Sequence, residues 1–83
     1  MENWGDVHCA LRRLIKEAEI EQGREITYDV IHQATGVTMS AISSLVNDKT
    51  RRYDAHVLAR LCRFFNCGIG DLLEYIPPAE DIP

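Results

Sequence analysis

The sequence predicts an all-α fold, a compact domain of five helices, from three observations. Apolar residues recur at helical spacing along most of the chain. Residues that favour helix N-caps precede these segments, and glycine, asparagine or proline follows them. Strand signals are few, because the best of them, Glu25–Tyr28, is short and overlaps a cap. The 83 residues suit one domain, which we expect to span residues 1–77, followed by a flexible tail at 78–83.

The first predicted helix runs from about Asp6 to Gln22. The Asp6 carboxylate is its expected N-cap, and Gly23 is its expected stop, because glycine readily adopts the left-handed conformation. The opposite face is charged, so we expect it to face solvent. The residues of the inner face are Val7, Ala10, Leu11, Leu14, Ile15 and Ala18.

A tight turn joins the second and third predicted helices. The second begins after the N-cap Thr27 and ends at Thr35, with Val30, Ile31 and Ala34 facing inward. Gly36 ends it, and Thr38 caps the third helix, Met39–Asn47. Two helices joined so tightly cross at a steep angle, which is the arrangement called helix-turn-helix.

The third predicted helix has an apolar side and a small, uncharged polar side. The apolar residues are Ala41, Ile42, Leu45 and Val46, and the polar side carries Met39, Ser40, Ser43, Ser44 and Asn47. Such a surface can lie against base edges without burying an unpaired charge. A solvated face is the alternative, although exposed helix faces are more often filled with Glu, Lys or Gln. Met39 would contact a thymine methyl group or cover the rim of the core.

A polar, basic loop and two further helices complete the chain. The loop is Asp48–Tyr53, and Asp54 is the expected cap of a fourth helix that ends at about Phe65. A break at Asn66–Gly68 precedes a short fifth helix, which we expect to include Asp71, Leu72, Leu73 and Tyr75 and to stop at Pro77.

The charge is unevenly distributed. The chain has a net charge of −4, yet Thr38–Arg63 holds five basic and two acidic residues, a net +3, and the rest holds four basic and eleven acidic residues, a net −7. Salt screens charges beyond about 10 Å, so phosphate binding depends on the local field. We expect Lys49, Arg51 and Arg52 to contact phosphates. The alternative is a solvated loop in which one arginine pairs with Asp48 or Asp54.

The sequence argues against several other classes of protein. No run of about 18 apolar residues could span a membrane, and the acidic N-terminus lacks the apolar core of a signal peptide, so we expect a cytoplasmic protein without a membrane partner. Cys9, Cys62 and Cys67 do not have metal-ligand spacing and are expected to be reduced, structural thiols. No catalytic arrangement or Gly-rich phosphate loop is present. The sequence therefore predicts no enzyme activity, no catalytic residue, no metal and no cofactor.

Two segments resemble a known family. Ile31–Lys49 resembles the helix-turn-helix of Xre/Cro-type, phage-repressor-like transcriptional regulators. Leu58–Pro77 is similar to a subgroup of small stand-alone members that end the fourth helix with Leu-Cys and close with Gly-Asp-Leu-Leu-Glu-Tyr and a proline. The resemblance covers roughly Leu11–Pro77 and implies a lambda-repressor-like DNA-binding fold, with the helix-turn-helix at helices 2 and 3.

The resemblance also implies roles for individual residues. Helix 3 would enter the major groove, and the N-terminus of helix 2 would lie against a phosphate. The residues implied or expected to contact double-stranded DNA are Thr27, Tyr28, Thr38, Met39, Ser40, Ser43, Ser44, Asn47, Lys49, Arg51 and Arg52. Three residues depart from the family pattern: His32 replaces a small residue, Met39 a base-reading glutamine, and Asp48 a glycine, which adds negative charge beside the groove.

We therefore expect a sequence-specific DNA-binding regulator that represses by occupying an operator, as a homodimer because three or four phosphate contacts per subunit bind weakly. Any small-molecule effector is unknown. Trp4, Phe64, Tyr75 and Ile76 are candidates for the dimer surface, although such residues more often belong to the core or its rim. The alternative is a protein-interaction or antitoxin-like module that keeps the fold but binds a protein partner.

Overall fold

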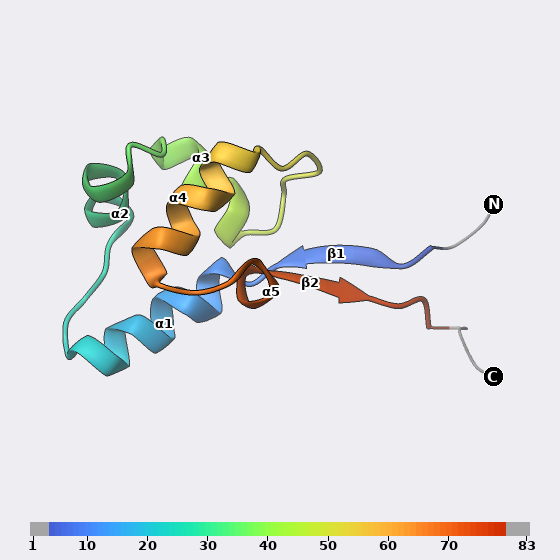
Figure 1. Ribbon diagram of the computed structural model, residues 1–83, viewed down its shortest axis with the longest axis horizontal. Helices are drawn as coiled ribbons and strands as arrows, with labels where there is room; N and C mark the ends of the chain where they lie inside the picture. Colours follow the sequence, from blue (N-terminus) through green and yellow to red (C-terminus); the bar gives the residue numbers. More distant parts are fainter. Residues whose placement is uncertain (1–3, 80–83) are drawn as a thin grey trace.

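The computed structural model describes residues 4–79 and consists of a helical body with a two-stranded ribbon at one end (Figure 1). The elements in chain order are β1 (Asp6–Cys9), α1 (Leu11–Gln22), α2 (Tyr28–Thr35), α3 (Met39–Val46), α4 (Ala55–Phe65), α5 (Ile69–Leu72) and β2 (Leu73–Ile76). The five helices agree with the expected helical fold. The body and ribbon together measure 44 × 24 × 19 Å along the principal axes.

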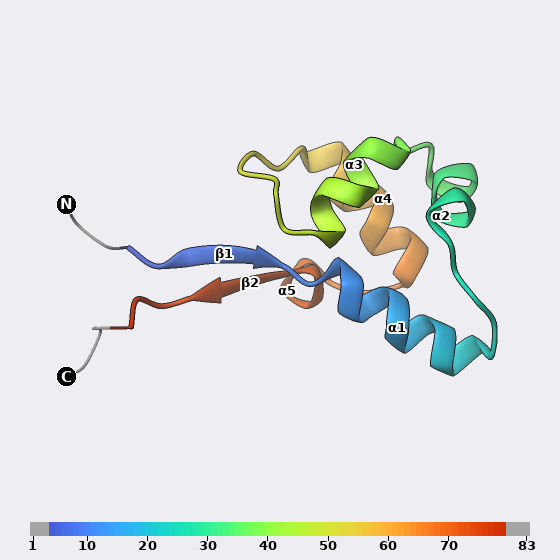
Figure 2. The ribbon, with the colours of Figure 1, turned by 180° about the vertical axis from the view of Figure 1, so that it is seen from behind.

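The ribbon corrects the prediction of a fold made of helices alone. Asp6–Cys9, expected to begin the first helix, is a strand, and Leu73–Ile76, expected within the fifth helix, is its antiparallel partner. Cys9 faces Leu73 and Asp6 faces Ile76, so the two ends of the described chain lie side by side (Figures 1 and 2). The strands form because each supplies the other's backbone hydrogen bonds, a pairing between distant segments that helical periodicity does not reveal.

The start of α1 differs for the same reason. The N–H of Ala10 donates to the carbonyl of Leu72 at 2.7 Å, so the chain leaves the ribbon at Ala10 and the helix begins at Leu11. The prediction that Asp6 caps α1 was therefore wrong, since the N-cap position is Ala10. Gly23 does end α1 in the left-handed conformation, with φ of 66°.

The core lies between the five helices. Its fully buried side chains include Leu11, Ile31, Ile42, Leu61 and Leu72, which come from α1, α2, α3, α4 and α5. Ile26 is also buried, and its N–H donates to the Glu19 carboxylate at 2.8 Å, which holds the link between α1 and α2. Ala34 is exposed, contrary to the expectation that it faces inward.

Candidate nucleic-acid interface

Three local signals hold α2 and α3 in place, as the sequence predicts. Thr27 caps α2, since its Oγ1 accepts from the N–H of Val30 at 3.2 Å. Gly36 ends α2 with φ of 78°, a conformation that costs glycine little. Thr38 then caps α3, because its Oγ1 accepts from the N–H of Ala41 at 3.1 Å. These contacts fix the direction in which α3 leaves the turn.

The turn is braced further by side chains whose part the sequence did not reveal. His32 Nδ1 lies 2.7 Å from the carbonyl oxygen of Val37, and because that oxygen can only accept, Nδ1 carries the proton. The Thr35 hydroxyl donates to the Ile31 carbonyl at 2.6 Å and accepts from the N–H of Val37 at 3.1 Å. The histidine that departs from the family pattern thus closes the turn from α2.

The outward side of α3 is uncharged along its first turn, where the apolar Met39 lies between the hydroxyl-bearing Thr38 and Ser40. Thr38, Met39 and Ser40 are exposed, whereas Ile42 and Leu45 are buried against the other helices. The beginning of α3 therefore presents a small hydroxyl-bearing surface to solvent.

The second half of the polar side is less open. Ser43 and Ser44 are half-buried. The carbonyl of Ser43 accepts from the amide Nδ2 of Asn47 at 2.9 Å, and the Asn47 Oδ1 accepts from Arg12 at 3.0 Å. Ser44 lines a hollow of about 210 Å³ together with Arg52. Asn47 thus links α3 to α1 through Arg12, and Ser44 lies beside the loop that carries Arg52.

The basic loop after α3 carries two cations without an ion pair and one with a partner. Within residues 4–79, Lys49 and Arg52 are exposed and their side chains make no ion pair. Arg51 Nη1 lies 3.5 Å from Asp6 Oδ1, and both side chains are mostly exposed. One arginine of the loop thus makes an ion pair, as the alternative of a solvated loop predicted. Its partner, however, is Asp6 of β1 and not Asp48 or Asp54.

Asp48 holds this loop against the ribbon. It has φ of 55°, the left-handed conformation that explains why glycine suits this place. Its Oδ2 lies 3.0 Å from His8 Nδ1, and its Oδ1 accepts from the N–H of Cys9 at 3.2 Å. The bond to His8, and then that to Cys9, lower the pKa of Asp48. Its negative charge is therefore directed toward β1. We expected this charge to lie beside the DNA groove, and the structure shows that it also holds the loop to β1.

The N-terminus of α2 is the other predicted contact. Thr27 is exposed there and Tyr28 is half-buried against the core. Asp29 follows in the first turn of the helix. Its carboxylate opposes phosphate binding at this place, so the basic loop has the stronger local attraction for a nucleic-acid backbone.

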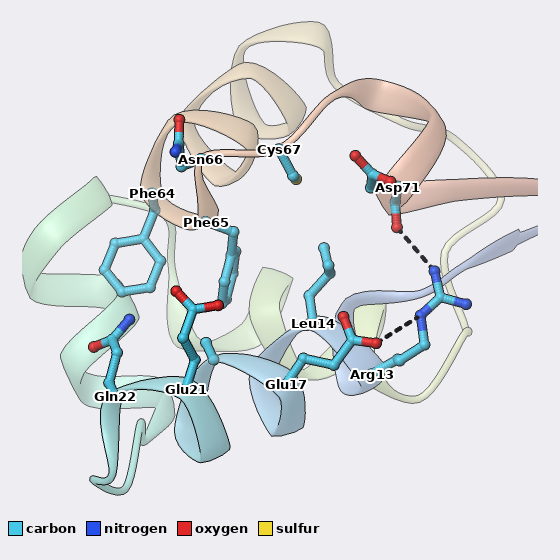
Figure 3. A pocket seen from close by; sticks show the side chains of 11 residues that line it. Arg13, Leu14, Glu17, Glu21, Gln22, Phe64, Phe65, Asn66, Cys67 and Asp71 are labelled. Atoms are coloured by element: carbon cyan, nitrogen blue, oxygen red, sulfur yellow. Dashed lines mark hydrogen bonds and ion pairs between the residues drawn. The ribbon is translucent and has the colours of Figure 1, made fainter.

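The far side of the helical body is acidic. A hollow of about 490 Å³ separates α1 from the end of α4, and Figure 3 shows the carboxylates of Glu17 and Glu21 on its rim, with Phe64 and Phe65 across from them. Arg13 lies at one end, where it donates to the carbonyl of Asp71 at 3.2 Å. Carboxylates repel phosphate, so this side is unsuited to DNA and the basic loop side is the candidate interface.

Cys9 is buried, Cys62 and Cys67 are half-buried, and all three are free thiols. Burial raises the pKa of both Cys9 and Cys67, so these thiols stay protonated. No cluster of three potential metal ligands occurs in the described part of the chain. Among residues 4–79, no helix has the length and apolar character needed to cross a bilayer.

Comparison with known families agrees with this geometry. Residues 10–78 match the model of the Cro/C1-type HTH DNA-binding domain. The chain belongs to that family. The match confirms the Xre/Cro-type resemblance and makes this a DNA-binding domain of a regulator type. Neither the curated proteins nor the solved structures include a significant match. The matched region begins after β1, so Asp6–Cys9 lies outside the part that defines this Cro/C1-type domain.

Proposed function

We propose that this Cro/C1-type protein is a sequence-specific transcriptional regulator that represses by occupying an operator. In this proposal α2 and α3 are the helix-turn-helix, and α3 enters the major groove. The observation that carries it is the uncharged, exposed first turn of α3 together with Lys49 and Arg52 in the loop that follows, whose side chains make no ion pair within residues 4–79. The hydroxyl groups can then lie in the major groove of the DNA, and the cations can contact the adjoining phosphates.

Each part of the interface has a distinct role in the proposal. Thr38, Met39 and Ser40 face base edges, and Ser43, Ser44 and Asn47 contact bases or the neighbouring backbone from the rest of α3. The phosphate contacts come from Lys49, Arg51, Arg52, Thr27 and Tyr28. Arg51 changes partner on binding, because a phosphate competes with Asp6 for its guanidinium.

Binding requires two copies on energetic grounds. Each phosphate neutralised contributes about −0.9 to the slope of log affinity against log salt. Three or four such contacts give one subunit only weak affinity, so we propose a homodimer on DNA. Helix-turn-helix dimers place their recognition helices about 34 Å apart, one turn of the duplex.

The second candidate function is a protein-interaction or antitoxin-like module. It is favoured by the net −7 charge outside Thr38–Arg63 and by the acidic rim between α1 and α4. Such a module would keep the fold and would bind a protein partner in place of DNA.

A salt titration separates the two functions. Anisotropy of a labelled random duplex is measured at several salt concentrations for the native chain and for Lys49→Ala/Arg52→Ala. The control is Lys16→Ala/Arg24→Ala, which removes the same charge from exposed residues on and just after α1. We expect the loop variant to reduce the salt slope by about 2 and the control to change it little. Equal effects of both variants, or no binding at low salt by a chain with native helical circular dichroism, would refute the proposal and favour the module.

Sequence preference is tested on the same protein. Selection of sites from a random DNA pool should give a palindrome for the native chain. We expect Ser40→Ala or Ser44→Ala to change which bases are preferred, and Arg51→Ala/Arg52→Ala to weaken binding to all sequences alike. Unchanged preference in both serine variants would remove α3 from the role of reading helix.

A further inference from the structure

The end of α4 is a Schellman motif, in which two backbone hydrogen bonds close the last turn of the helix. Asn66 adopts the left-handed conformation, with φ of 52°, and its N–H donates to the carbonyl of Arg63 at 3.3 Å. The N–H of Cys67 reaches farther back and donates to the carbonyl of Cys62 at 3.0 Å. This motif commonly brings the side chains of its two outer residues into contact, and here both of those residues are cysteines.

The two cysteines are close enough for a disulfide. The Cα of Cys62 lies about 2.4 Å from its own carbonyl oxygen, and the backbone N of Cys67 lies about 1.5 Å from its Cα. Because the bond between that oxygen and that nitrogen is 3.0 Å long, the two Cα atoms are at most about 6.9 Å apart. Cysteines can be bridged up to a Cα separation of about 7 Å. The Cys62 thiol also forms a side-chain hydrogen bond with that of Cys67.

Cys67 can be reached from solvent through the hollow between α1 and the end of α4. It lines that hollow of about 490 Å³, and Figure 3 shows its side chain pointing into it. Both Cys62 and Cys67 are half-buried and carry free thiols, whereas Cys9 is only 2% exposed. The pair is therefore reduced, in contact, and open to a small molecule.

The opening of the hollow is negatively charged. Glu17, Glu21 and Asp71 line it, and its only cationic residue, Arg13, lies 3.8 Å from the Glu17 carboxylate. The formal charge of the lining is therefore −2. A lining of one sign attracts small molecules of the opposite charge and repels those of the same charge.

We propose that Cys62 and Cys67 form a reversible disulfide by exchange with a small cationic disulfide that enters this hollow. The Cys67 thiolate attacks one sulfur of the reagent, whose S–S bond breaks and releases one reagent thiolate. The Cys62 thiolate then attacks Cys67 Sγ in the mixed disulfide and releases the second reagent thiolate. The protons of the two cysteines pass to the released thiolates, so the reagent is reduced by two electrons and the pair is oxidised by two. The proposal does not depend on the DNA-binding function.

The surroundings of Cys67 keep the pair reduced until such a reagent arrives. Burial, and then the neighbouring Cys62 and Asp71, raise the pKa of the Cys67 thiol. Since the thiolate is the attacking form, little of it is present at neutral pH. We expect the rate of exchange to rise nearly tenfold per pH unit between pH 7 and 8.

Mass spectrometry of the native chain after incubation with cystamine, a cationic disulfide, tests the proposal. We expect a product lighter than the reduced chain by two hydrogen atoms, with a link between Cys62 and Cys67 in the peptide map. Cys9→Ser is the matched control and should give the same link, whereas Cys62→Ser should keep one cysteamine on Cys67. A native chain whose three thiols all stay free, or one that carries cysteamine without an internal link, would overturn the proposal.

Reagent charge tests the role of the hollow. We expect cystamine to oxidise the pair roughly tenfold faster than the anionic glutathione disulfide. Glu17→Gln/Glu21→Gln should reduce this ratio, and Glu25→Gln/Asp29→Asn, which removes the same charge from exposed residues outside the hollow, should leave it unchanged. Equal rates for the two reagents, or equal effects of the two variants, would contradict entry through the hollow.

Urea unfolding of the oxidised chain gives a third measurement. A bond that the folded end of α4 accepts without strain restricts only the unfolded chain, so we expect the urea midpoint to rise by roughly 1 M on oxidation. Reduction with dithiothreitol should restore the original midpoint. A midpoint lower in the oxidised than in the reduced chain would show that the native geometry does not fit the disulfide, which contradicts the proposal.

Discussion

The α2–α3 unit and the terminal ribbon are built in opposite ways. In the first, Thr27, Gly36 and Thr38 act on neighbouring residues, and buried side chains such as Ile42 tie the helices to the core. In the ribbon, residues from opposite ends of the chain pair, and the large side chains stay exposed. The α2–α3 unit is thus held by local caps and core packing, whereas the ribbon is held by pairing between distant segments and keeps apolar surface exposed.

The largest difference between the two regions should appear on truncation of an apolar side chain. Ile42→Ala removes a side chain with no exposure and should lower the free energy of unfolding by about 3 kcal/mol. Ile76→Ala, at the ribbon, should change it by less than about 0.5 kcal/mol. Urea unfolding followed by circular dichroism measures both. Similar losses for the two variants would mean that the ribbon is as firmly packed as α3.

Gly36→Ala tests the turn itself. A Cβ there would meet only the end of the Arg60 side chain, at 3.7 Å, so the cost is conformational, about 1–2 kcal/mol of unfolding free energy. Gly23→Ala at the end of α1 is the matched control, because it also has positive φ and open space around it. We expect comparable destabilisation from both and weaker DNA binding from Gly36→Ala alone. Equal DNA affinity of the two variants would argue that the turn does not set the position of α3.

Thr38→Ala removes the cap of α3 and should cost about 1 kcal/mol of unfolding free energy. Thr38→Ser retains the hydroxyl and should unfold close to the native chain. Thermal or urea unfolding distinguishes them. If Thr38→Ser were as destabilised as Thr38→Ala, the methyl group and not the bond to the Ala41 N–H would be the stabilising contact.

The smallest expected change in stability concerns Asp48, whose carboxylate bonds the loop after α3 to β1 of the ribbon. The pKa of Asp48 is lowered in the folded chain, so its charged form contributes stability above about pH 4, and the contribution is lost as the pH falls through the folded value. Asp48→Asn keeps an acceptor and tolerates positive φ. Because the site is exposed, we expect a loss below about 1 kcal/mol at neutral pH.

The pH dependence of this loss is the measurement. The difference in unfolding free energy between Asp48→Asn and the native chain should shrink as the pH falls below about 4. A difference that stays constant from neutral pH into that acid range would mean that the charge of Asp48 has no part in holding the loop to β1.

The sequence predicted the helix ends that depend on interactions between neighbouring residues. Thr27, Gly36, Thr38, Gly23 and Asp54 all act at helix ends as their chemistry indicates. It did not predict the ribbon, because four residues with two or three apolar positions fit a helix or a strand, and only the partner at the other end of the chain decides. The same long-range contact explains the partner of Arg51 and the role of Asp48, since both depend on where β1 lies.

We propose that the DNA surface consists of α3 and the loop after it. Titration of the labelled protein with a duplex at low salt, followed by amide NMR shifts, tests this most directly. We expect the largest shifts at residues 38–44 and 49–52, and small changes at residues 16–23, on α1 and at its end. Shifts concentrated on α1, or none anywhere in the chain, would contradict it.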